Sequence, residues 1–293
     1  METNKLKFDG KNLFNIKKTD TKLDDFYESE EDYLSQLSDF QDKIDQLQSI
    51  MYAHNRYGLL VILQASDAAG KDGTIKAVFS GMNPVGLKIH SFKRPSEEEL
   101  DHDYLWRSMT KAPERGMITV FNRSYYEEVL VVKTNPTLLT EGQKIPEELT
   151  DNIEKVWKNR YQDMANYEQY LSNNGIKIVK VFLNVSKKEQ GERLIERIED
   201  PTKNWKFDEN DVKVRSQWQE YQQAYQDMIN QTATQQAPWY VIPADDKKNM
   251  RLLLAKIILE QLKEMKMSYP ESSPERKQTL NDLVEIINQQ NEE

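Results

Sequence analysis

Leu63-Gln-Ala-Ser-Asp-Ala-Ala-Gly-Lys-Asp-Gly-Thr-Ile75 is the stretch that decides the fold. It begins in the apolar run Gly58–Gln64, which is too short for a free-standing helix and is typical of a buried strand. It then leads into a predicted helix. A turn of small residues between a strand and a helix can direct backbone N–H groups at an anion. The sequence therefore predicts a phosphate-binding turn in an α/β protein.

The turn matches most of the P-loop pattern G-x-x-x-x-G-K-[ST]. Gly70 and Lys71 occupy the core of that pattern. Two positions depart from it, because Ala65 stands at the first glycine and Asp72 at the Ser or Thr that normally binds magnesium. The alternative interpretation is an ordinary strand–helix turn with chance glycines and a solvated lysine.

Small side chains let the turn wrap closely around a phosphate, and Lys71 adds a mobile cation. We expect phosphate or nucleotide contacts from the residues of the turn and of the first helical turn after it, namely Ala68, Ala69, Gly70, Asp72, Gly73 and Thr74. The carboxylate of Asp67 lies inside the loop, where it would repel phosphate unless a cation stood between them. We therefore interpret Asp67 as a ligand of Mg²⁺, or of Mn²⁺ in its place.

Outward from this turn, apolar runs alternate with helical patterns. Four further runs predict strands, at Leu87–Phe92, Met117–Phe121, Ile176–Val185 and, more weakly, Trp239–Ile242. Two helix starts carry capping boxes, Ser96 with Glu99 and Ser186 with Glu189. This alternation predicts a parallel five-stranded sheet covered by helices on both faces, a three-layer α/β sandwich.

The chain shows no internal repeat or linker, so residues 1–293 are predicted to form one domain. An arm and a long amphipathic helix make up about residues 1–55, with apolar residues at three- and four-residue steps from Glu31 to Asn55. Helices are also expected over Asp208–Thr232 and Asp246–Met267. About residues 268–293 form a C-terminal helical tail with one short apolar stripe.

The segment after the third predicted strand contains a second set of candidate residues. Ligands of open parallel sheets bind beyond the carboxyl ends of the strands, so Asn122, Arg123 and Ser124 should face the same crevice as the loop. Arg123 can stabilise charge on a transferring phosphoryl group, and Glu127 lies one helical turn further on. The alternative roles are a surface arginine and, for Ser124, a helix cap.

At this point the residues resemble a known family, the family-2 polyphosphate kinases. The resemblance rests on four motifs, Ala65–Gly73, Phe121–Glu127, Asp200–Phe207 and Pro238–Asp245, and runs from about residue 30 to 265. It implies a thymidylate-kinase-like P-loop fold with a helical lid. It also implies Mg²⁺-dependent transfer of phosphoryl groups between polyphosphate and nucleotides.

The resemblance also implies roles for particular residues. Asp67 and Lys71 match the family's first catalytic pair, and Arg123 matches the arginine of its second motif. Asn122 stands where most of the family has aspartate. Together with Glu127 it resembles the subgroup that accepts both AMP and ADP.

The lid is predicted at about residues 192–211. It carries Arg193 and Arg197, four residues apart on one helix face, and then Lys203. Each of these cations is a candidate phosphate ligand when the lid closes. The alternative is a solvated face on which the arginines pair with neighbouring acids.

The net charge of −9 argues against general nucleic-acid binding, and it requires any polyphosphate site to be a local basic track. Candidates for that track are Lys76, Lys93, Arg94, Arg107 and Arg115. The chain has no cysteine and no apolar run of membrane-spanning length, so a cytoplasmic protein without a membrane partner is expected. The expected ligands are polyphosphate and AMP, ADP and ATP, with guanine nucleotides allowed. The apolar faces of both end segments suggest a homo-oligomer, either a dimer or a tetramer.

Three other functions are compatible with parts of this pattern. An ATP-dependent nucleotide or small-molecule kinase would share the fold but would normally keep Ser or Thr at position 72. A GTP switch would need an Asn-Lys-x-Asp motif, and Asn4-Lys5 is followed by Leu6-Lys7. A noncatalytic P-loop scaffold would leave the charges of the two motifs without a purpose.

Overall fold

The sheet of this computed structural model, which describes residues 1–292, contains every strand that the sequence predicted and one more. Its strand order is β1-β6-β5-β2-β4-β3. The bounds are β1 Lys7–Phe8, β2 Gly58–Ala65, β3 Leu87–Ser91, β4 Ile118–Asn122, β5 Ile176–Asn184 and β6 Trp239–Pro243. Strands β2 to β6 are parallel, but β1 pairs antiparallel with β6. The prediction of a purely parallel five-stranded sheet was therefore wrong, because the N-terminal arm adds an edge strand.

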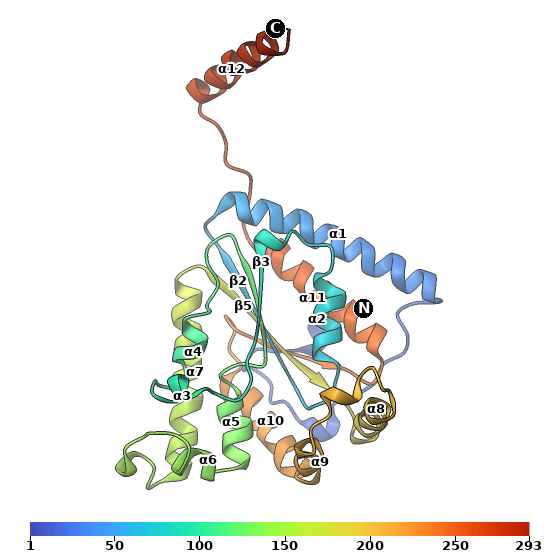
Figure 1. The fold of residues 1–293 in the computed structure, drawn as a ribbon, viewed down its shortest axis with the longest axis vertical. Helices are drawn as coiled ribbons and strands as arrows, with labels where there is room; N and C mark the ends of the chain where they lie inside the picture. The colour runs from blue at the N-terminus through green and yellow to red at the C-terminus, as the bar shows by residue number, and fades with distance from the viewer. Residues whose placement is uncertain (293) are drawn as a thin grey trace.

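Strands β2 and β5 form the centre of the sheet. Their register runs from Gly58 opposite Ile176 to Ala65 opposite Leu183. Every residue of β2 is buried, as expected for a parallel strand that is covered on both faces. Because the strands are parallel, their carboxyl ends all lie at one edge of the sheet, and Figure 1 shows them pointing towards α8 and α9.

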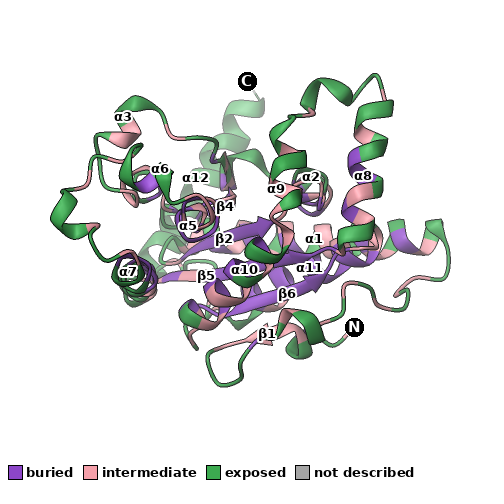
Figure 2. Cartoon of the chain, turned by 90° about the horizontal axis from the view of Figure 1, so that it is seen from below, coloured by how far each residue is buried: buried purple, intermediate pink, exposed green. Residues whose placement is uncertain are grey.

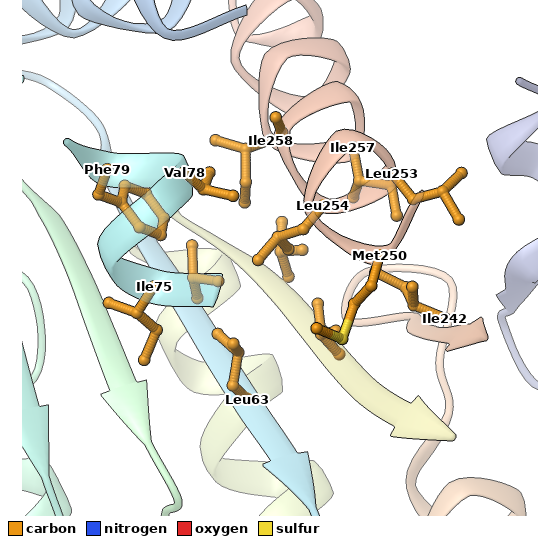
Figure 3. Packing of buried hydrophobic residues seen from close by; sticks show 14 of the residues in the cluster. Leu63, Ile75, Val78, Phe79, Ile242, Met250, Leu253, Leu254, Ile257 and Ile258 are labelled. Carbon is orange, nitrogen blue, oxygen red and sulfur yellow. The ribbon is translucent and has the colours of Figure 1, made fainter. Parts of the chain in front are cut away.

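Helices cover both faces of the sheet, and buried strands run between them in Figure 2. One face carries α1 (Glu30–His54), α2 (Lys71–Phe79) and α11 (Lys247–Glu264). The other carries α5 (Glu127–Thr134), α7 (Ile153–Asn173) and α10 (Trp218–Thr232). Figure 3 shows how side chains of α2 and α11 meet over Leu63 and Ile242 of the sheet. The structure is thus a three-layer sandwich with one core on each side of the sheet.

Six further α-helices complete the fold of the described residues. They are α3 (Glu97–Leu100), α4 (Trp106–Met109), α6 (Thr137–Thr140), α8 (Lys187–Glu199), α9 (Asn210–Ser216) and α12 (Pro274–Glu292). The predicted lid corresponds to the second half of α8, the loop after it and the start of α9. The helix expected over Asp208–Thr232 is divided at Gln217 into α9 and α10.

Helix α12 stands apart from the body at the end of an extended segment (Figure 1). None of its described residues is buried. Its apolar stripe is exposed and consists of Leu280, Leu283, Val284, Ile286 and Ile287. Within residues 1–292, no helix has both the length and the apolar character needed to cross a membrane.

Helix caps follow the sequence with one informative exception. Ser96 and Glu99 form the complete capping box at α3. At α8 the Ser186 hydroxyl accepts a hydrogen bond from the backbone N–H of Glu189. The Glu189 carboxylate instead accepts from Nε of Arg193 at 2.7 Å. That half of the predicted box is replaced by an ion pair which fixes the direction of Arg193.

Candidate active site

The loop between β2 and α2 is a tight turn with two left-handed residues. Ala68 and Gly70 both have left-handed backbones, with φ of 60° and 102°. A Cβ atom on Gly70 would lie 3.3 Å from Cε of Met250, a buried residue of α11 that Figure 3 labels. Glycine is therefore favoured at this position by its left-handed conformation, and any larger residue would also have to displace the end of the Met250 side chain.

Lys71 is the first residue of α2, and its side chain folds back over the loop. Its Nζ donates to the carbonyl oxygens of Ala65 at 2.8 Å and Ser66 at 3.2 Å. Burial, and after it the nearby positive charge of Arg123, lowers the pKa of Lys71 to about 8. The ammonium group is thus held at the mouth of the loop by weak backbone acceptors, which a phosphate oxygen can displace.

Arg123 follows β4 directly and crosses to the loop. Its backbone is left-handed, with φ of 64°, and its N–H donates to the carbonyl of Leu63 on β2 at 3.0 Å. Its Nη2 donates to Oδ1 of Asp67 at 2.5 Å, and its Nη1 lies 3.9 Å from Oε2 of Glu127. Burial opposes the charge of Arg123, but Glu127 and Asp67 outweigh it and raise its pKa. Asp67, Lys71, Arg123 and Glu127 therefore form one group, called the site cluster below.

Glu127 is supported by a residue that sequence analysis did not single out. In one orientation of its amide, Gln64 donates to Oε1 of Glu127 at 2.8 Å and accepts from the backbone N–H of Ser124 at 3.1 Å. Burial raises the pKa of Glu127, while Arg123 and Lys71 pull it down. The signal that could have pointed to Gln64 is a polar residue at the end of an otherwise apolar strand.

Asn122 contacts the position where the loop departs from the usual pattern. Its Nδ2 donates to Oδ1 of Asp72 at 2.7 Å, on the first turn of α2. A longer bond of 3.4 Å reaches the hydroxyl of Ser91 at the end of β3. The amide of Asn122 therefore joins α2 to the end of β3. An aspartate at position 122 would instead place two carboxylates together.

Helix α8 holds the loop from the other side. The Arg193 guanidinium donates to the carbonyl oxygens of Ala69 at 2.8 Å, Ala244 at 2.7 Å and Asp245 at 2.9 Å. Nearby, Nε2 of Gln190 donates to the carbonyl of Asp67 at 3.2 Å. Arg193 is buried and faces the backbone of the loop, so this structure does not place it as a phosphate ligand. Its position fixes the start of α8 to the loop.

The rest of the predicted lid carries a charged pair near Asp67. Arg197 donates to Oδ2 of Asp211 at 3.2 Å, joining α8 to α9. Burial and then the proximity of Asp67 raise the pKa of Asp211 to about 6. Sequence analysis did not identify Asp211 as a site residue, because helical spacing does not show which way α9 turns. Lys203 lies apart on the surface, where it pairs with Glu196 at 3.0 Å and Asp200 at 2.8 Å.

The five residues predicted to form a basic track are divided by the fold. Lys93 and Arg94 are exposed just beyond the carboxyl end of β3, and Lys76 is exposed on α2. Arg107 is engaged by Glu99 at 3.1 Å and by the carbonyl of Lys93 at 2.7 Å. Arg115 donates to the carbonyl oxygens of Arg56 and Asn174, which precede β2 and β5. The amino ends of parallel strands lie at the opposite edge from the site, so the structure does not bring Arg115 to the site cluster.

The carboxylates at this edge of the sheet are candidate ligands for Mg²⁺. Among residues 1–292 no three His, Cys, Asp or Glu side chains are grouped as a metal cage. Mg²⁺ usually needs only one or two carboxylates, because water and substrate phosphates complete its shell. Asp67 in the loop and Asp72 at the helix start offer such oxygen donors, so the residues present fit this metal.

Cationic groups and free helix N–H groups at the carboxyl edge of a parallel sheet suit the handling of phosphate. Fold and site together define a phosphotransferase. A sequence profile described as polyphosphate kinase 2 matches residues 27–270, and the chain belongs to that family.

Individual relatives and one solved structure agree with this assignment. The chain is 48% identical over 261 residues to an ADP-polyphosphate phosphotransferase of Rhodopseudomonas palustris, covering 89% of each chain. It is 42% identical over 229 residues to an AMP/ADP-polyphosphate phosphotransferase of Meiothermus ruber, covering 78% of this chain and 80% of the relative. The crystal structure of polyphosphate kinase 2 from Arthrobacter aurescens is 32% identical with a TM-score of 0.84, and the match covers 96% of this chain and 95% of the other.

Proposed function

We propose that this chain moves phosphoryl groups from inorganic polyphosphate to AMP and ADP, yielding ADP and ATP, in a reversible reaction that needs Mg²⁺. Family membership and the names of the two relatives support the reaction class. The observation that carries the proposal is the contact between Arg123 and Asp67 beside the buried Lys71. It puts two cations and a carboxylate where the P-loop helix begins.

Transfer between phosphoanhydrides breaks one phosphoanhydride bond and forms another of the same kind. Positioning and charge compensation therefore provide most of the catalysis. Loop N–H groups and Lys71 would hold the oxygens of the donor phosphates. Arg123 would stabilise the charge on the phosphoryl group in transit, exchanging Asp67 for a phosphate oxygen. Bound Mg²⁺ would neutralise phosphate charge, with Asp67 and Asp72 as its protein ligands. Mn²⁺ has the same preference for oxygen donors and is expected to replace it.

The acceptor is the part of the proposal on which the two relatives differ by name. Asn122 and Glu127 are the residues proposed to let the site accept both AMP and ADP. Each lies within the site, Asn122 against Asp72 and Glu127 beside Arg123, and neither side chain is bonded to the backbone of the loop. Glu127→Ala is expected to reduce AMP use more than ADP use. Equal losses for the two acceptors would contradict a role for Glu127 in acceptor choice.

Purified protein supplied with Mg²⁺, polyphosphate and either AMP or ADP tests the whole proposal. We expect ADP and then ATP to form without any added nucleoside triphosphate. An enzyme that requires ATP as donor would give no product under these conditions. Replacing polyphosphate by ATP in a parallel reaction, and adenine by guanine nucleotides, defines the donor and the base accepted.

We extend the proposal to the assembly and the compartment. The exposed apolar stripe of α12 supports a homo-oligomer, a dimer or a tetramer. Light scattering after size exclusion would give its mass, and a monomer at micromolar concentration would contradict it. Nucleotide substrates make the cytoplasm the expected compartment.

A further inference from the structure

A second charged group lies behind the site cluster and is fully enclosed. Glu168 on α7 accepts from the Tyr125 hydroxyl at 2.8 Å and from the Tyr126 hydroxyl at 2.6 Å, both at Oε1. Its other oxygen accepts from Nζ of Lys180 on β5 at 2.6 Å. The side chains of Lys180 and Glu168 are 0% and 1% exposed. We call Glu168, Lys180, Tyr125 and Tyr126 the buried anchor.

Both tyrosines come from the segment that carries two members of the site cluster, Arg123 and Glu127. Arg123 and Glu127 flank the sequence Ser124-Tyr125-Tyr126, so anchor and site share one turn of backbone. That turn is closed by short hydrogen bonds, among them Glu127 N–H to the carbonyl of Ser124 at 3.1 Å. The arginine and the glutamate face the loop while the two phenol rings face the core on the other side. A rotation of this turn would move Arg123 and Glu127 together.

The anchor joins several elements at one point. Besides Glu168, Nζ of Lys180 contacts the Tyr126 hydroxyl at 3.1 Å and the carbonyl of Thr232 on α10 at 2.8 Å. The ammonium group also lies 5.2 Å from the ring centroid of Trp239 on β6. Burial, and then the charge of Glu168, raises the pKa of both tyrosines well above the usual value, so their hydroxyls stay protonated and donate. The turn is therefore tied to α7, β5, α10 and β6.

A buried ion pair of this kind does not by itself improve stability over apolar side chains, because removing both charges from water offsets their attraction. Its contribution here is directional, since two phenol donors and one ammonium occupy defined positions around a single carboxylate. Arg123 needs such support, because its left-handed backbone is unusual for a residue with a side chain.

We infer that Glu168, with Lys180 as its counter-ion, is a positioning residue for phosphoryl transfer: it holds Tyr125 and Tyr126, and through them sets Arg123 and Glu127 against the loop. This inference rests on the proposed function for its kinetic consequence. Its geometric content, the placement of Arg123 relative to Asp67, stands independently of the substrate.

The test removes the two hydroxyls and keeps the rings and the ion pair. In the double variant Tyr125→Phe with Tyr126→Phe, we expect kcat with polyphosphate and ADP to fall about tenfold or more, because a misplacement of about 1 Å can cost a hundredfold. The KM for polyphosphate should change by less than about twofold. Tyr167→Phe is the matched control, since Tyr167 is a buried tyrosine of α7 whose hydroxyl has no hydrogen-bond partner within residues 1–292. It should leave kcat unchanged.

A second measurement separates positioning from general loosening of the fold. In a background of Arg123→Ala with Glu127→Ala, the same tyrosine substitutions should reduce the residual rate by less than about twofold, because both groups that they position are already absent. An undiminished loss in that background would overturn the inference, as would an unchanged kcat in the double variant with Arg123 intact.

Failure of the proposed function can be distinguished from failure of the positioning inference. If the wild-type chain makes no ATP from polyphosphate, the function is wrong, and crystal structures of wild type and the double variant then decide the positioning. We expect the Arg123–Asp67 contact to be lost or lengthened in the variant and kept in Tyr167→Phe. An unmoved Arg123 would overturn the inference.

Discussion

The site cluster and the buried anchor both contain carboxylates paired with cations, but the two groups differ in how exposed these charges are and in how strongly they are bonded. In the anchor, every charged atom meets a partner inside the protein and almost nothing is exposed. In the site cluster, Arg123 and Asp67 keep 36% and 24% of their side chains exposed, and Lys71 is held only by carbonyl oxygens. Closed charge networks fix a backbone, whereas charges with weak or replaceable partners remain available to a ligand. Distance between charged groups alone would not have separated the two.

The largest expected effect is a loss of stability when one charge of the buried anchor is removed. Lys180→Met leaves a buried Glu168 carboxylate without its cation, which is expected to reduce the free energy of unfolding by about 3–5 kcal/mol. Urea denaturation followed by circular dichroism measures this. The paired variant Glu168→Gln with Lys180→Met should recover most of the loss. A single variant as stable as wild type would show that the anchor is not a coupled pair.

Substitutions in the site cluster should lower activity and leave the fold intact. Arg123→Ala or Lys71→Ala is expected to lower turnover by at least about a hundredfold, because each removes a cation aimed at developing phosphate charge. The midpoint of urea unfolding should shift little, since both side chains have weak or exposed partners. Near-full turnover in either variant would remove that residue from the mechanism.

The availability of Lys71 should also be visible as a pH dependence. Its pKa is lowered to about 8, so the ammonium is charged below that pH and becomes neutral above it. The kcat/KM for polyphosphate should therefore be level below pH 8 and fall about tenfold per unit above it. Lys71→Arg keeps its charge throughout, so its profile, although lower, should stay level over the same range. An identical fall in that variant would assign the titration to another group.

The smallest effect concerns cations outside both groups. Lys93→Ala with Arg94→Ala is expected to raise the KM for long polyphosphate a few-fold and leave kcat unchanged, because exposed cations attract a polyanion without touching the reacting atoms. Arg115→Ala is the control, as it lies at the other edge of the sheet. If Arg115→Ala raised KM equally, the track would have to follow a different face.

Much of this arrangement was readable in the sequence because it depends on local patterns. The five apolar runs became β2 to β6 within about a residue, and the motif residues Asp67, Lys71 and Arg123 meet because parallel strands end together. The same rule, applied to Arg115, would have placed it before β4 and away from the site.

Other features depend on tertiary contacts that no local pattern contains. A two-residue strand such as β1 has no periodicity to detect, and its pairing with β6 depends on the path of the whole arm. Helical spacing placed Arg193 and Arg197 on one face, but only the packing of α8 shows that Arg193 turns to the loop backbone. Lys180 was visible as a lysine inside the apolar run Ile176–Val185, and its partner Glu168 was not.

Strand β1 has a consequence for how this chain behaves in a concentrated solution. An open parallel sheet has two lateral borders, and each one exposes backbone groups that a foreign strand can join. Here the arm occupies the Trp239–Tyr240 part of one border, leaving β3 as the free one. A chain shortened by its first ten residues would expose both borders, so it should self-associate more readily than the chain that keeps them, even where its catalytic edge is untouched.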